Sequence, residues 1–180
     1  MAGIFWQFLF YSFLGFLFEI TFARLARHPK RDRKCHLILP VCPVYGFGAM
    51  AILLLPQSFK ASPPLLYLSG ALCATAVEWL LAVFYEKAAG APFWDYKALP
   101  WNFQGRVCLI FSLFWGLLAL PLVYWVEPWL SPRVALISPA VTIPALLFYL
   151  GDAATSLFLL RRLGTEGLRW YDRFRPSEAR

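Results

Sequence analysis

The chain has 180 residues, of which 60% are hydrophobic and 15% charged, with a formal net charge of +7. Its mean hydropathy of +0.59 is too high for a soluble domain, and the apolar residues come in long blocks. The basic residues flank these blocks and form no folded basic face, so the composition argues against nucleic acid as a partner and indicates a multi-pass protein of the lipid bilayer.

Five apolar blocks predict an all-α polytopic membrane protein with five transmembrane helices. In chain order the blocks are residues 3–23, 41–59, 65–85, 107–126 and 134–160. The first block has no basic n-region and no small-residue cleavage site, so we interpret it as a retained helix and not a signal peptide. The second is only just long enough to cross, so a partly re-entrant path is an alternative. Together, residues 1–160 are predicted to form a single transmembrane helical domain.

The connections between the blocks differ in character. Residues 24–40 hold six basic side chains and predict a solvated loop that contacts anionic lipid. Residues 127–133 contain two prolines and predict a tight loop. Residues 161–180 form a basic tail whose apolar side chains favour a helix lying on the membrane surface; these are Leu168, Trp170, Tyr171 and Phe174.

The distribution of basic residues predicts the orientation in the membrane. Fifteen of the seventeen Lys and Arg residues lie in segments 24–40, 86–106 and 161–180, and the remaining two are Lys60 and Arg133. Cytoplasmic loops carry an excess of Lys and Arg. We therefore expect a cell-membrane protein with its N-terminus outside, five crossings, and its C-terminus in the cytoplasm.

Residues 86–106 are predicted to form an inner loop that is re-entrant or interfacial. Prolines and glycines between residues 90 and 105 exclude one continuous helix, and the aromatic residues suit the headgroup region of a bilayer. The polar residues of this loop are Asp95, Asn102 and Arg106. An arginine at the start of a helix gains nothing from the helix dipole, so we expect Arg106 to contact Glu78, Glu19 or Asp95.

The predicted orientation places three acidic residues at a similar depth. Glu19, Glu78 and Asp152 fall roughly 7–13 Å below the cytoplasmic edge, at 1.5 Å per helical residue. A bare carboxylate in hydrocarbon costs on the order of a few kcal/mol, so these groups must be paired, protonated or hydrated. One interpretation is a cytoplasm-facing polar cavity formed by Glu19, Tyr45, Glu78, Asp95, Asn102, Arg106 and Asp152. The other is a dry lock in which Arg106 pairs with one acid while the others are neutral and hydrogen-bonded.

Small residues four apart predict close helix packing at Gly70/Ala74 and Ser112/Gly116, against a helix of the same chain or of a second copy. The spacing of Cys35, His36 and Cys42 matches no common zinc pattern, so we expect no metal and no cofactor. The chain has no Walker A, GxSxG or HExxH sequence. It therefore carries no ATPase motif of its own, and enzymatic activity is not indicated.

Three motifs are YSFLGFLFE at 11–19, PVCPVYGFG at 40–48, and WDYKALPWNFQGRVCL at 94–109, continued by SLFWG at 112–116. Together they resemble the putative type IV ABC-transporter permease family of CmpB-like membrane proteins, which also places an acid at the position of Glu78. The resemblance covers roughly residues 5–125. The chain departs from the family at 34–40, where the family has an Arg-Gly pair and a Gly-Pro, and at Phe93, where it prefers a second tryptophan.

This resemblance implies a permease-like subunit of a transporter. Five helices are few for a pore, so such a subunit would form a homo-oligomer and act with a separate ATPase subunit, with 86–106 as the coupling surface. The alternative is a non-transport membrane protein: a scaffold, a lipid-binding regulator, or a small membrane-embedded enzyme that uses the inner acids.

Overall fold

The structure, a computed structural model, describes residues 2–25, 35–90, 92–164 and 168. These residues form helices and one small hairpin, which confirms the all-α class. The helices are α1 (Ala2–Leu25), α2 (Pro43–Leu53), α3 (Gln57–Lys60), α4 (Pro63–Ala89), α5 (Leu109–Pro121), the π-helical turn η1 (Leu122–Val126), α6 (Glu127–Val134) and α7 (Pro139–Leu163), and the strands are β1 (Asn102–Phe103) and β2 (Val107–Cys108). Most of the basic loop and of the predicted surface helix at 161–180 lies outside the described residues.

Four helical runs are long and apolar enough to cross a bilayer, which confirms a multi-pass membrane protein. They are α1, α4, the continuous run from α5 through η1 to α6, and α7. The fifth predicted crossing, 41–59, contains no such helix. Its longest piece, α2, has 11 residues and a length of about 16 Å, about half of a hydrocarbon core of about 30 Å. The part of the chain that the structure describes thus provides four candidate spans, and the count of five is not confirmed.

Residues 127–133 are helical, so the predicted tight loop is wrong. Pro121 lacks an N–H group and cannot donate to the preceding turn, and a π-helical turn directly follows it, so the helix continues past the proline. Pro128 lies in the first turn of α6, directly after this π-helical turn. The chain turns instead at 135–138, before Pro139 begins α7 and the Ser138 side chain accepts a hydrogen bond from the Ala140 N–H.

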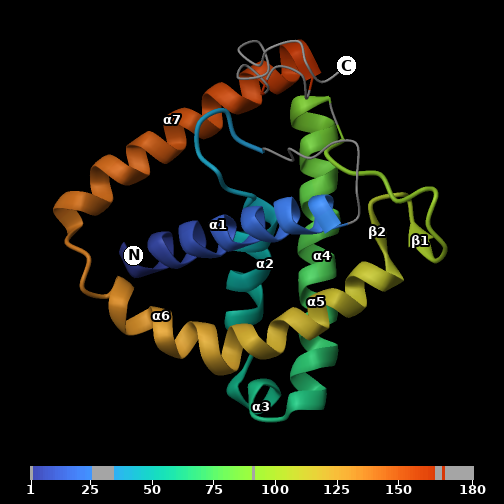
Figure 1. Cartoon of the computed structure of the whole chain (residues 1–180), viewed down its shortest axis with the longest axis vertical. Helices are drawn as coiled ribbons and strands as arrows, with labels where there is room; N and C mark the ends of the chain where they lie inside the picture. Colours follow the sequence, from blue (N-terminus) through green and yellow to red (C-terminus); the bar gives the residue numbers. More distant parts are fainter. Residues whose placement is uncertain (1, 26–34, 91, 165–167, 169–180) are drawn as a thin grey trace.

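The candidate spans cross one another and do not form a parallel bundle (Figure 1). The helix α4 runs along the long axis with α2 packed beside it, while α1 packs on α2 and α5 packs on α4. The helix α7 runs along the outside, and its C-terminal end meets that of α4 through Tyr85, Ala89 and Leu160. Much apolar surface therefore stays exposed. The exposure is greatest on α7, where only 17% of the residues in its most apolar stretch are buried.

Small residues allow α4 and α5 to approach closely, as the sequence predicts. A Cβ atom at Gly70 would lie 2.6 Å from the Cβ atom of Ala119, and one at Gly116 would lie 2.7 Å from the Tyr67 carbonyl oxygen. Ala74 is fully buried. Packing within the chain is confirmed at Gly70, Ala74 and Gly116 of the two predicted small-residue pairs.

Candidate functional site

Residues 92–108 form a hydrogen-bonded hairpin at the C-terminal end of α4. The strands β1 and β2 pair antiparallel, with Phe103 opposite Val107. Between them Gln104 and Gly105 have positive φ angles of 57° and 71°, and the Arg106 N–H closes the turn on the Phe103 carbonyl at 3.1 Å. Glycine adopts such an angle without a steric penalty, and a Cβ at Gly105 would also lie 2.8 Å from the Asp95 carboxylate. The loop is therefore a defined structural unit.

Asn102 and Asp95 organise the hairpin itself. The Asn102 amide donates to the Leu99 carbonyl at 2.8 Å, and its carbonyl accepts from the Gly105 N–H at 3.0 Å. Asp95 accepts from the Lys97 N–H at 2.9 Å and lies 3.7 Å from the Lys97 ammonium, on the exposed side of the loop. Both residues fold the loop, and the contacts found for them do not reach the neighbouring helices.

Arg106 forms its ion pair with Glu86, so the prediction that it would contact Glu78, Glu19 or Asp95 is wrong. Its Nε lies 3.0 and 3.1 Å from the two Glu86 oxygens, its Nη2 lies 2.6 Å from Oε2, and its Nη1 donates to the side-chain amide oxygen of Gln104. Glu86 stands two helical turns beyond Glu78, near the C-terminus of α4, where a cation is favoured by the helix dipole. Partial exposure at this position also removes the cost of burying the arginine charge.

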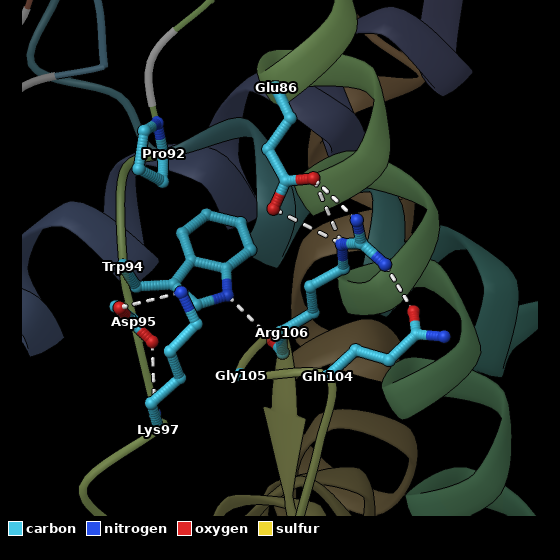
Figure 2. A pocket seen from close by; sticks show the side chains of 8 residues that line it. All are labelled: Glu86, Pro92, Trp94, Asp95, Lys97, Gln104, Gly105 and Arg106. Atoms are coloured by element: carbon cyan, nitrogen blue, oxygen red, sulfur yellow. Dashed lines mark hydrogen bonds and ion pairs between the residues drawn. The ribbon is translucent and has the colours of Figure 1, made fainter.

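A charged pocket of about 300 Å³ lies between the hairpin and the end of α4 (Figure 2). It is lined by Glu86, Pro92, Trp94, Asp95, Lys97, Gln104, Gly105 and Arg106. Figure 2 shows the Arg106–Glu86 pair on one side and Asp95 with Lys97 on the other. The Trp94 indole N–H donates to the Arg106 carbonyl at 2.8 Å and so joins the two sides.

Glu78 is the buried acid to which the hairpin is tied. Its side chain comes from the middle of α4, and the residue is 4% exposed. The Tyr96 hydroxyl donates to Oε1 at 2.9 Å, and the Trp115 indole N–H donates to Oε2 at 3.0 Å. Burial, assisted by the neighbouring Glu78 carboxylate, raises the pKa of Tyr96, so its hydroxyl keeps the proton that it donates.

Glu19 and Tyr45 extend this arrangement toward α1. The Tyr45 hydroxyl donates to Glu19 at 2.9 Å, and the Tyr45 ring packs against the ring of Trp115 with centroids 5.0 Å apart. Gly15 makes room, because a Cβ there would lie 2.2 Å from the Tyr45 ring. We call the set Glu19, Tyr45, Glu78, Tyr96 and Trp115 the inner acid network.

Two members of this network, Tyr96 and Trp115, were missed among the predicted site residues. A signal was present in the sequence, because a buried Tyr or Trp requires a partner for its O–H or N–H group. Both also lie in the third family-like motif. The sequence alone did not show which of the many aromatic residues would point inward.

Asp152 belongs to a different part of the fold. Its carboxylate accepts from the Ile38 N–H at 3.0 Å and the Leu39 N–H at 2.9 Å, and it lies 3.2 Å from His36 Nδ1. Burial lowers the pKa of His36, outweighing the opposing effect of Asp152, so the neutral imidazole donates from Nδ1. The partners of Asp152 are thus residues 36–39, and it anchors a loop where the sequence predicted a place in the common cavity.

This anchored segment leads into α2 beside the middle of α1. The Cys42 N–H donates to the Ser12 carbonyl at 2.8 Å, and the Leu37 N–H donates to Ser156 Oγ at 2.8 Å. Non-helical backbone at membrane depth is tolerated where protein groups satisfy it. Asp152, Ser156 and the Ser12 carbonyl accept hydrogen bonds from this backbone. The segment that leads into α2 can therefore stay non-helical, and α2 is a short helix.

A family model described as Putative ABC-transporter type IV matches residues 6–157. The matched stretch contains the hairpin, the inner acid network and Asp152. No curated protein and no solved structure matches the chain.

Proposed function

The chain belongs to the putative type IV ABC-transporter family, and from this premise we propose that it is the permease subunit of such a transporter, acting with a separate ATPase subunit. An ATPase acts outside the membrane, so its conformational change must reach polar groups within the membrane domain. The hairpin offers a direct route. It carries exposed aromatic side chains and is hydrogen-bonded to a buried acid.

The observation that carries the proposal is the hydrogen bond between Tyr96 and Glu78. In the same segment, Trp101, which directly precedes β1, is 81% exposed, and Phe103 of β1 is 59% exposed. A partner that bound these aromatic rings and moved the hairpin would act on Glu78 through a loop whose backbone is tied at several points. The Arg106–Glu86 pair provides a second attachment to α4.

The substrate path is proposed to open at the inner acid network, on the cytoplasmic side. In the conformation described, Tyr96 and Trp115 occupy both oxygens of Glu78, and Tyr45 occupies Glu19. Withdrawal of the hairpin removes Tyr96 and leaves a polar opening lined by the two acids. The short helix α2 supports this assignment, because discontinuous helices at membrane depth line the binding sites of many transporters.

The proposed orientation in the cell membrane places the hairpin in the cytoplasm and the N-terminus outside. Single cysteines at Ser62 and Ala98, in a background without the four native cysteines, test it with an impermeant reagent on intact cells. We expect labelling at Ser62 and none at Ala98. Labelling at Ala98 alone would place the hairpin outside the cell, away from an ATPase, and would contradict the proposed orientation.

A homo-oligomer completes the proposed permease. The exposed apolar face of α7 supports this, since the candidate spans of one chain enclose little interior. Native mass spectrometry from a mild detergent is expected to detect at least a dimer. A strictly monomeric protein that retains its ATPase partner would count against this part of the proposal.

Photo-crosslinking tests the role of the hairpin. A photoreactive phenylalanine at Trp101 is expected to capture a protein that contains a Walker A sequence and hydrolyses ATP. The matched control is Leu136, which is 85% exposed in the turn between α6 and α7; crosslinking there should not capture this protein. Failure at Trp101 in a correctly inserted protein would favour a scaffold, a lipid-binding regulator or a membrane-embedded enzyme.

A further inference from the structure

An apolar groove of about 480 Å³ runs between the first half of α1 and α6, away from the hairpin. Its walls are residues 6–13 of α1, the segment 39–41, and residues 129–137 of α6 and the turn that follows. In Figure 1 the N-terminal half of α1 lies beside α6. The volume falls within the range of about 300–1,000 Å³ that is typical of small-molecule sites.

The lining of the groove is apolar apart from one charge. Arg133 is the single charged residue among the lining residues. Its guanidinium lies over the Trp129 ring at 4.3 Å and donates to the Trp129 carbonyl. No carboxylate pairs with it among the residues that the structure describes. Within that part of the chain, the positive charge of Arg133 therefore has no acidic partner.

The acidic residue of α6, Glu127, has its hydrogen-bond partners on α1 and not at Arg133. Glu127 accepts from the Gln7 side chain at 2.7 Å and from the Tyr11 hydroxyl, and so holds α6 against α1. That contact fixes the two walls of the groove. Trp6 and Trp129 are among the lining residues, and tryptophan prefers the headgroup level of a bilayer.

From these observations we propose that the groove binds one phospholipid with a net negative headgroup, an acyl chain lying along α1 and α6 and the phosphate on Arg133. The apolar walls match the chain, and the unpaired guanidinium matches a phosphate in charge and geometry. The site is independent of the proposed permease role, because it shares no residue with the hairpin or the inner acid network.

The experiment uses the whole chain in nanodiscs with an acyl-chain photoreactive phosphatidylglycerol or the matching phosphatidylcholine. Peptides that contain residues 6–13 and 129–137 are expected to be labelled more strongly by phosphatidylglycerol. Arg133→Gln should reduce this preference about fivefold, the ratio that corresponds to about 1 kcal/mol per basic side chain at a membrane surface. Leu9→Trp, which fills the groove, should reduce labelling by both lipids.

Matched controls separate this site from lipid that surrounds any membrane protein. Arg162 lies over the Phe158 ring at 4.8 Å on α7, so Arg162→Gln removes a similar stacked arginine outside the groove and should leave the labelling unchanged. Equal labelling by both lipids in the wild-type protein, or no effect of Arg133→Gln, would overturn the proposal. A disulfide-linked dimer formed through a cysteine at Phe13 would also overturn it, since the groove would then be an interface between two copies.

Discussion

The Tyr96 hydroxyl and the Glu78 carboxylate lie 2.9 Å apart, although one comes from the hairpin and the other from the middle of α4. The Tyr96 ring is held in place by stacking on Phe111, with centroids 4.9 Å apart. Ring and hydroxyl thus have separate partners, and they can be tested separately.

Tyr96→Phe keeps the stacked ring and removes the hydroxyl. We expect a loss of about 1–3 kcal/mol in the free energy of unfolding, because a buried acceptor loses its donor. Hydrogen exchange in residues 92–108 should increase while the α4–α5 contact stays protected. Tyr124→Phe is the control, since that hydroxyl donates to the Lys60 carbonyl on an exposed surface. Equal exchange in the two variants would contradict the attachment of the hairpin to Glu78.

Gly116→Ala and Gly151→Ala are expected to have opposite effects. A Cβ at Gly116 would meet the Tyr67 carbonyl at 2.7 Å, so we expect overpacking to cost about 1–3 kcal/mol. No atom lies within 4 Å of a Cβ at Gly151, so alanine there should stabilise α7 by about 0.5–1 kcal/mol through helix propensity. Thermal unfolding in detergent measures both changes. A stabilised Gly116→Ala variant would show that α4 and α5 are not packed at this point.

Asp152→Ala should release the segment that leads into α2. The carboxylate accepts from two backbone N–H groups, and each buried donor left unsatisfied costs about 1–3 kcal/mol. We expect a marked loss of thermal stability together with increased hydrogen exchange at residues 37–39. Thr155→Ala removes an exposed hydroxyl from the same helix as the comparison and should change the melting temperature little. Similar losses in the two variants would mean that Asp152 does not anchor the segment.

His36 gives this segment a pH dependence whose direction is fixed. Its pKa is lowered in the folded protein by burial, so the unfolded chain binds the proton more tightly. The stabilising contribution is complete above the unfolded pKa of about 6.5 and decreases as the pH falls from there toward the lower folded value. Melting temperatures should therefore decline as the pH is lowered from 7.5 to 5.

His36→Asn separates this contribution from that of other groups. The asparagine amide can donate to Asp152 but does not titrate in this range. We expect its melting temperature to depend less on pH than that of the wild-type protein. The same slope in both proteins would assign the pH dependence to other groups.

The membrane class, the presence of the four longest helices and the family followed from the sequence alone. A block of about twenty apolar residues can form only a few structures in a bilayer, because no water is available there to hydrogen-bond its backbone groups. The glycines that bring α4 and α5 together were also visible, since small residues four apart form a close-packing surface on any helix. These properties depend on residues that are close together in the sequence, so the sequence alone is enough to predict them.

The partners of the charged and polar groups were decided by the tertiary structure. Depth along a helix placed Glu19, Glu78 and Asp152 at one level, but the helices cross, so Glu19 and Glu78 share one network while Asp152 lies elsewhere. Glu78 received Tyr96 and Trp115, and Asp152 received the backbone of residues 38 and 39. A carboxylate accepts from any donor within reach, and reach depends on the crossing of helices and the folding of the hairpin. Neither is determined by the spacing of residues along the chain.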